Sequence, residues 1–138
     1  MRVAYVAGPY RASTPWGVHL NIEAAKAVAF ELWRMGYAVL CPHANTAMMD
    51  FGCDEVFLDG DLEILKRCDL VVVCPGWESS EGTQAEIAHA HNELKAVYYW
   101  PEDREDIVRA VNAPAPASRM RFAVDRLQEA LEEYGPDD

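Results

Sequence analysis

Short apolar runs alternate along the chain with stretches in which apolar residues recur at helical spacing. The apolar runs predict four strands, at residues 2–7, 37–41, 70–74 and 96–99. The helical spacing predicts four helices between and after them, at residues 21–35, 54–67, 83–94 and 102–112. Residues 42–53 show neither pattern and are expected to form a loop.

The order of these elements predicts an α/β fold, because strands and helices alternate along the chain. We expect a single flavodoxin/Rossmann-like three-layer domain, with a parallel sheet of four or five strands and helices on both faces. The run Leu70–Cys74 is apolar throughout, as is typical of a strand buried on both faces. Gly36 follows the first helical stretch and is expected to end it.

The chain is expected to divide at residue 112. Residues 1–112 would form the α/β domain, and residues 113–138 would form an Ala-Pro linker and a C-terminal helix. That helix carries an apolar stripe, which suits docking either on its own domain or on a partner subunit. The stripe consists of Met120, Val124, Leu127 and Leu131.

The formal net charge of −11 argues against duplex nucleic acid as a partner, since phosphate binding needs concentrated Lys and Arg. A small phosphorylated ligand needs only a few local donors and stays compatible with this charge. No apolar run approaches the roughly 20 residues that a bilayer span requires. No signal peptide is recognised either, so we expect a cytoplasmic protein without a membrane partner.

The cysteines do not predict a metal site. Cys41, Cys53, Cys68 and Cys74 form no C-x-x-C pair, so zinc is not expected and free thiols are. The glycines match neither G-x-G-x-x-G nor a P-loop, so the sequence supports neither NAD nor nucleoside triphosphate as a ligand. We therefore expect no cofactor.

In a parallel α/β sheet the ligand lies beyond the carboxyl ends of the strands, which directs attention to residues 7–19, 42–53 and 75–83. In the last of these, Ser79, Ser80 and Gly82 lead into a helix, whose free N–H groups suit an anion or a polar sugar. Ser79 or Ser80 would equally serve as the helix cap. Trp77 in the same segment would stack on a base or pack against the protein.

Two acidic residues are candidates for catalysis. Glu86 lies about one turn inside the helix that follows residues 75–83, where its carboxylate can point back toward the strand ends. From spacing alone it is either a functional acid or a charge favoured by the helix dipole. Asp61 follows Gly60 and is either a functional acid or a carboxylate at the start of a helix.

The loop after the first strand contributes candidate binding residues. Gly8, before Pro9, permits a ligand to approach the backbone closely. Arg11 would grip a phosphate or carboxylate, or lie at the surface as an ordinary arginine. Tyr10 would stack on a base or pack against the protein.

Three motifs together resemble the nucleoside 2-deoxyribosyltransferase superfamily, which includes deoxynucleoside 5′-monophosphate N-glycosidases. They are Tyr5-x-x-Gly8-Pro9, Gly60-Asp61-Leu62 leading to Cys68-Asp69, and Ser80-x-Gly82-x-x-x-Glu86. The resemblance covers roughly residues 2 to 100 and leaves the last part of the chain uncovered. It implies a homodimer or higher homo-oligomer that acts on a small nucleoside or nucleotide.

The resemblance also implies roles for individual residues. Glu86 would be the nucleophile on the anomeric carbon, Tyr5 would hold that carboxylate, and Asp61 would handle a proton at the leaving base. Ser80 falls where the transferases keep an aspartate and the monophosphate hydrolases a serine near the 5′-phosphate. His43 falls near a histidine of some of those hydrolases, or is a loop or capping histidine.

Ser80, with Arg11 in the first loop, favours hydrolysis of the N-glycosidic bond of (2′-deoxy)nucleoside 5′-monophosphates. One alternative is a nucleoside 2-deoxyribosyltransferase that exchanges bases on free deoxynucleosides. Another is a non-catalytic nucleotide-binding or sensing domain. An N-glycosidase acting on NAD-like dinucleotides or ribonucleotides is also compatible with the sequence.

Overall fold

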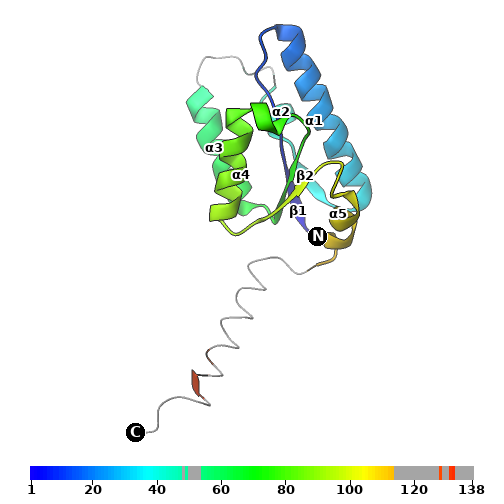
Figure 1. The fold of residues 1–138 in the computed structure, drawn as a ribbon, viewed down its shortest axis with the longest axis vertical. Helices are drawn as coiled ribbons and strands as arrows, with labels where there is room; N and C mark the ends of the chain where they lie inside the picture. Colours follow the sequence, from blue (N-terminus) through cyan, green and yellow to red (C-terminus); the bar gives the residue numbers. More distant parts are fainter. Residues whose placement is uncertain (48, 50–53, 114–127, 129–130, 133–138) are drawn as a thin grey trace.

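The computed structural model of the chain describes residues 1–47, 49, 54–113, 128, 131 and 132 (Figure 1). The predicted Ala-Pro linker and C-terminal helix lie almost entirely outside these residues, and so does Cys53. The division of the chain at residue 112 therefore stays a prediction.

Four parallel strands form the sheet, in the order β2-β1-β3-β4. Their bounds are β1 (Val3–Ala7), β2 (Ala38–Leu40), β3 (Leu70–Val73) and β4 (Ala96–Tyr99). The central strands β1 and β3 pair so that Tyr5 lies beside Val71. The predicted parallel sheet is thus confirmed, with four strands in the part of the chain that the structure describes.

Helices cover both faces of this sheet (Figure 1). Their bounds are α1 (Pro15–Met35), α2 (Pro42–Asn45), α3 (Asp54–Arg67), the 3₁₀ helix η1 (Trp77–Ser79), α4 (Glu81–Asn92) and α5 (Arg104–Ala110). Helices α1 and α5 pack on one face, and α3 and α4 pack on the other. The predicted three-layer arrangement is confirmed.

The strands supply both faces because successive side chains of a strand point to opposite sides. In β1, Ala4 and Val6 join the core under α1 and α5, whereas Tyr5 and Ala7 join the core under α3 and α4. All four residues of β3 are fully buried, which explains its uninterrupted apolar sequence. Tyr5 consequently lies on the same side of the sheet as α4.

Helix α1 begins six residues before its predicted start. Thr14 is its N-cap, with Oγ1 accepting a hydrogen bond from the Gly17 N–H at 3.0 Å, and Pro15 occupies the first turn. The helix ends as predicted at Gly36, whose φ of 106° is a left-handed conformation that glycine adopts without strain. The sequence pattern misses this start because Pro15 and Gly17 are typical of loops. The apolar residues Trp16 and Leu20 are exposed, so they do not continue the buried stripe of the helix.

Three other helices differ from the sequence prediction. Residues 42–45 form the short helix α2 inside the predicted loop, since Pro42 suits a first helical turn. Helix α5 is shorter than predicted at both ends. Helix α4 begins at Glu81, two residues early, so Glu86 lies in its second turn rather than its first.

Candidate active site

A tyrosine and a glutamate meet beneath helix α4. The Tyr5 side chain is fully buried, and its hydroxyl donates a hydrogen bond of 2.5 Å to Oε2 of Glu86. This bond joins the middle of β1 to the second turn of α4, across 81 positions of sequence. This bond uses Oε2 of the Glu86 carboxylate, so Oε1 is the oxygen that does not contact the Tyr5 hydroxyl.

The environment of this pair favours uncharged forms. Burial raises the pKa of Glu86 to about 7, against the hydrogen bond from Tyr5, and the charge of Asp61 raises it further. Burial and the neighbouring Glu86 charge also raise the pKa of Tyr5, so its hydroxyl stays protonated and donates at any physiological pH. A carboxylate that titrates near neutrality is typical of functional sites.

Asp61 belongs to the same site. It lies in α3, next to α4 on this face of the sheet, and burial raises its pKa to about 6. Its charge raises the pKa of both Glu86 and Tyr5, so the three groups share one electrostatic environment. The structure therefore brings together the three residues that the sequence singled out for catalysis.

These groups lie next to the point where the strand order reverses, between β1 and β3. Gly8 follows β1 and lies directly against Cys74, which follows β3. A Cβ atom at Gly8 would lie only 2.8 Å from Cβ of Cys74, so a larger residue would push the two strand ends apart. Glycine is needed here for the approach of protein to protein, whether or not a ligand also lies close.

His43 holds the loop that follows β1. It is 6% exposed in the first turn of α2, and its Nε2 donates to the Pro9 carbonyl at 2.9 Å. The Tyr10 ring meets the imidazole edge-on, with ring centroids 5.7 Å apart. Burial lowers the pKa of His43, against the hydrogen bond to the Pro9 carbonyl, and so favours the neutral ring. His43 thus has a structural role, and its role in binding substrate stays a prediction.

The first loop is also tied to α1. The Asn21 side-chain amide donates to the carbonyl oxygens of Tyr10 and Arg11, at 3.1 and 3.3 Å. The Arg11 side chain is exposed on this loop. Nothing in the sequence pattern singled out Asn21, because an asparagine at a helix surface carries no signal of its tertiary contact.

The segment before α4 has the predicted polar character. The Ser80 side chain caps α4 by accepting from the Thr83 N–H at 3.3 Å, so the capping interpretation is confirmed. The Ser79 hydroxyl donates to the Gly76 carbonyl at 3.2 Å. Gly82 is exposed, and a Cβ atom added to it would extend into open space beyond the helix.

Trp77 packs against the protein. Its ring lies 5.2 Å from that of Tyr99, between centroids, at the carboxyl ends of β3 and β4. Gln84 holds the same segment, since its side-chain amide donates to the Glu78 carbonyl at 2.6 Å. The packing role predicted for Trp77 is therefore present, and stacking on a base remains a prediction.

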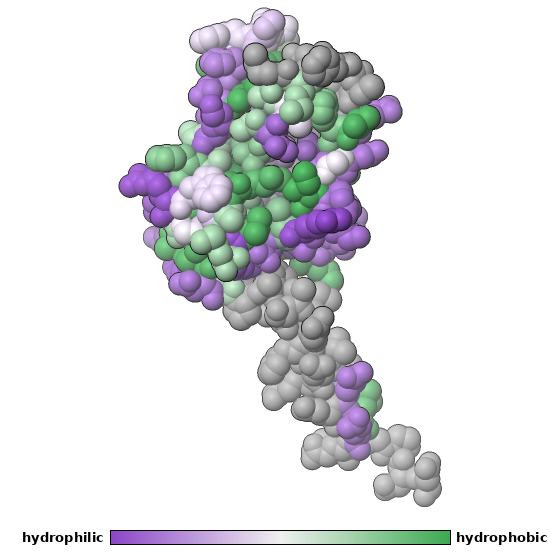
Figure 2. All heavy atoms as spheres, turned by 180° about the vertical axis from the view of Figure 1, so that it is seen from behind, coloured by the Kyte–Doolittle hydropathy of each residue, from purple (hydrophilic) through white to green (hydrophobic). Residues whose placement is uncertain are grey.

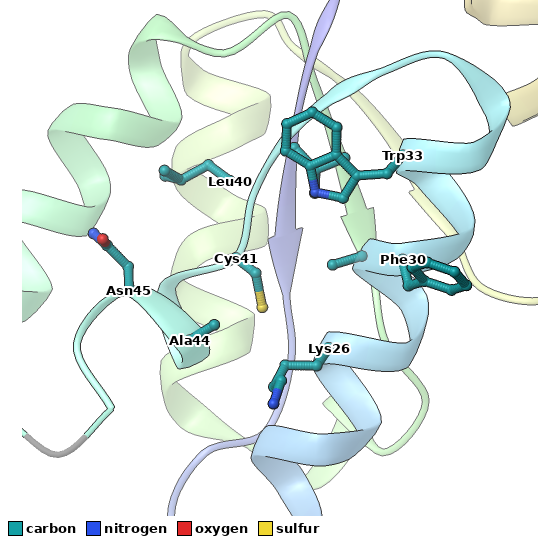
Figure 3. Close-up of a pocket in the computed structure, with 9 residues that line it drawn as sticks. Lys26, Phe30, Trp33, Leu40, Cys41, Ala44 and Asn45 are labelled. Atoms are coloured by element: carbon teal, nitrogen blue, oxygen red, sulfur yellow. The ribbon is translucent and has the colours of Figure 1, made fainter.

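A separate groove opens on the face turned away in Figure 1, where Figure 2 shows apolar side chains gathered between polar rims. It measures about 400 Å³ and lies between α1, β2 and α2 (Figure 3). Its lining residues are Lys26, Ala29, Phe30, Trp33, Val39, Leu40, Cys41, Ala44 and Asn45. The lining includes no carboxylate, so the groove is not the place of acid chemistry.

Neither metal nor thiol chemistry is indicated by the described part of the chain. No group of three His, Cys, Asp or Glu residues there could hold a metal ion. Cys41, Cys68 and Cys74 are free thiols, and burial raises the pKa of Cys68 to about 11 and that of Cys74 to about 12. Among the described helices, none is long and apolar enough for a membrane span.

Similarity to known proteins identifies the family and the fold of this chain. A family model described as a domain of unknown function, DUF4406, matches residues 2–99. The chain belongs to this family. No curated protein sequence matches the DUF4406 chain.

A solved structure similar to this DUF4406 chain is a 2-deoxyribosyltransferase from the psychrotolerant bacterium Bacillus psychrosaccharolyticus, described as a biocatalyst for nucleoside synthesis. The identity is 22%, the TM-score is 0.53, and the match covers 70% of each chain. The flavodoxin-like α/β fold is therefore confirmed, and the resemblance to the 2-deoxyribosyltransferase superfamily is confirmed at the level of the fold.

Proposed function

We propose that this DUF4406 protein is an N-glycosidase that cleaves the bond between base and sugar in 2′-deoxynucleoside 5′-monophosphates. The observation that carries the proposal is the part-buried Glu86 carboxylate, held by the Tyr5 hydroxyl beside the point where the strand order reverses. A carboxylate in that position can attack the anomeric carbon of a sugar bound in the crevice.

The reaction would proceed in two displacements. Oε1 of Glu86 attacks C1′ as the bond from C1′ to the base nitrogen breaks, and a glycosyl ester forms. Asp61 donates a proton to the departing base. A water molecule, deprotonated by the Asp61 carboxylate, then attacks C1′ and releases deoxyribose 5-phosphate and the Glu86 carboxylate. Tyr5 holds Oε2 throughout.

Glu86 and Asp61 both titrate close to neutral pH. With Asp61 near 6 and Glu86 near 7, the two carboxyl groups together carry about one proton in the neutral range. The reaction needs one ionised group to attack and one protonated group to serve the base. The pair keeps one proton at a pH where two ordinary carboxyl groups would both be ionised. Because Glu86 has the higher pKa, this proton lies mainly on Glu86 in the free protein, and the reactive form is the one in which it has passed to Asp61.

The choice of a deoxynucleotide rests on two further observations. The similar solved structure is a 2-deoxyribosyltransferase, which supports a 2-deoxy sugar. Ser80 lies at the start of α4, where a hydroxyl and the helix N–H groups suit a phosphate. The resemblance seen in the sequence associates a serine at this position with the monophosphate hydrolases.

The same similarity supports a second candidate, a transferase that exchanges bases on free deoxynucleosides. It shares the Glu86 chemistry and differs in the acceptor, which is a second base in place of water. A third possibility, a nucleotide-binding domain without catalysis, gives no account of two carboxyl groups tuned to titrate near neutrality.

Activity on a panel of nucleotides and nucleosides distinguishes these candidate functions. Base release is measured by chromatography for dCMP, dGMP, dUMP and the matching nucleosides, with and without an acceptor base, and for NAD and CMP. The proposal predicts release from deoxynucleotides without an acceptor. Reaction of nucleosides alone, and only with an acceptor, would identify a transferase, while binding without turnover would identify a sensing domain.

A further inference from the structure

A buried threonine lies directly beneath the Ser80 side chain. Thr83, in the first turn of α4, is 1% exposed, and its Oγ1 lies 2.8 Å from Oγ of Ser80. A hydroxyl with so little access to solvent needs a hydrogen-bond acceptor inside the protein. Ser80 Oγ is that acceptor within the described residues, so the Thr83 hydroxyl donates and the Ser80 oxygen accepts.

This contact constrains the direction of the Ser80 proton. A serine oxygen accepts at most two hydrogen bonds and donates one. Ser80 Oγ accepts from the Thr83 hydroxyl and from the Thr83 N–H, so both acceptor sites are taken. The Ser80 O–H is then left to donate away from Thr83, and Ser80 is partly exposed, so a ligand can reach it.

We propose that Thr83 is a positioning residue, which turns the Ser80 hydroxyl into a fixed donor for the 5′-phosphate and so favours nucleotides over nucleosides. The inference rests on the proposed function and names the origin of its substrate preference. A fixed donor suits phosphate oxygens, which only accept, and its hydrogen bond to an ionised oxygen is stronger than one to a sugar hydroxyl.

Because the side chains near Ser80 are acidic, phosphate binding there depends more on the direction of hydrogen-bond donors than on electrostatic attraction. The exposed side chains of Glu78 and Glu81 flank Ser80 and oppose an anion. The N-terminal end of α4 carries a partial positive charge that offsets them only in part. A phosphate there depends on oriented donors, and a serine hydroxyl free to rotate would provide a weaker one.

The test compares Thr83→Val with Thr83→Ser. Valine keeps the shape of the buried side chain and removes its hydroxyl, whereas serine keeps the hydroxyl. We expect Thr83→Val to raise KM for dCMP about tenfold with kcat changed less than about twofold, as for a lost charge-assisted hydrogen bond. The preference for dCMP over deoxycytidine, as a ratio of kcat/KM, should fall by the same factor, and Thr83→Ser should restore it.

Ser80→Ala gives an independent arm, because it should match Thr83→Val and the double variant should lose no more than either alone. If Thr83→Val does not fold, Thr83→Ala takes its place with the same expected loss of preference. An unchanged preference in a folded valine or alanine variant, or a serine variant that behaves like valine, would overturn the inference. A wild-type protein that cleaves no deoxynucleotide would overturn the proposed function as well.

Discussion

The two faces of the sheet are built from the same strands and have different chemistry. Under α1 and α5 the buried cluster is apolar apart from the Tyr37 hydroxyl, and Leu32 of α1 is fully buried in it. Beside this cluster, the buried Arg2 side chain donates a hydrogen bond to the Ala110 carbonyl of α5. Under α3 and α4 the core is smaller, and the buried Tyr5 meets Glu86 in place of another apolar side chain. One face stabilises the fold, and the other gives up some stability to hold a carboxylate in a buried place.

The largest effect is expected at Glu86. Glu86→Gln keeps the shape of the side chain and can still accept the Tyr5 hydrogen bond, and it removes the nucleophile. Base release from dCMP should fall by at least about a thousandfold, which corresponds to about 4 kcal/mol.

The matched control is Glu105→Gln, at an exposed position of α5, which packs on the opposite face of the sheet. Its base release should stay within about threefold of wild type, since an exposed charge outside the reaction contributes little. A Glu86→Gln variant as active as this control would place the chemistry elsewhere.

The second-largest effect is expected on stability, from a change in the core under α1 and α5. Leu32→Ala should lower the free energy of unfolding by about 3 kcal/mol, because it leaves a cavity in the core under α1. The kcat of the protein that remains folded should not change. Urea denaturation with activity measured in the folded range checks both statements, and a large fall in kcat would show that the two faces are not independent.

A smaller effect is expected from Tyr5→Phe, which removes the hydroxyl and keeps the ring. Loss of this hydrogen bond should lower kcat about thirtyfold, or about 2 kcal/mol. Because the bond holds down the pKa of Glu86, that pKa should rise in the variant. The pH optimum, expected near about 6.5 in wild type, should therefore move upward. An optimum that moves downward would contradict the geometry.

The smallest effect is on stability. The pKa of Glu86 in the folded protein, about 7, exceeds the ordinary value of 4.5, so the wild-type protein loses stability as pH rises from 4.5 to 7. Glu86→Gln should be more stable than wild type above pH 7, by on the order of 1–2 kcal/mol once solvent screening is allowed for. The gain should vanish below pH 4.5. Thermal melts at pH 8 and pH 4 measure the difference.

The apolar face of this fold is easy to predict and the chemical face is harder. The sequence predicts the ends of β3, β4 and α3 to within one residue. An uninterrupted apolar run such as Leu70–Cys74 has few alternatives to a buried strand. It also singles out Tyr5, Asp61 and Glu86. Spacing alone left Glu86 between catalysis and a helix charge, and only the contact with Tyr5 on a distant strand distinguishes the two.

Other features depend on tertiary contacts that no local pattern reveals. The hydrogen bond from His43 to Pro9 and the contact of Gly8 with Cys74 each join segments far apart in sequence. Thr83 offers the exception, since it follows the N-cap Ser80 by three residues and so lies on the same side of the first helical turn. That spacing could have indicated the pair of hydroxyls.

The stereochemistry of the product tests the central claim most directly. If Glu86 attacks C1′ and a second nucleophile then displaces it, the sugar carbon is inverted twice. In the presence of methanol, wild-type protein and dCMP should give methyl 2-deoxyriboside 5-phosphate in the β configuration of the substrate, as seen by NMR. An α product would mean a single displacement and would contradict Glu86 as the nucleophile.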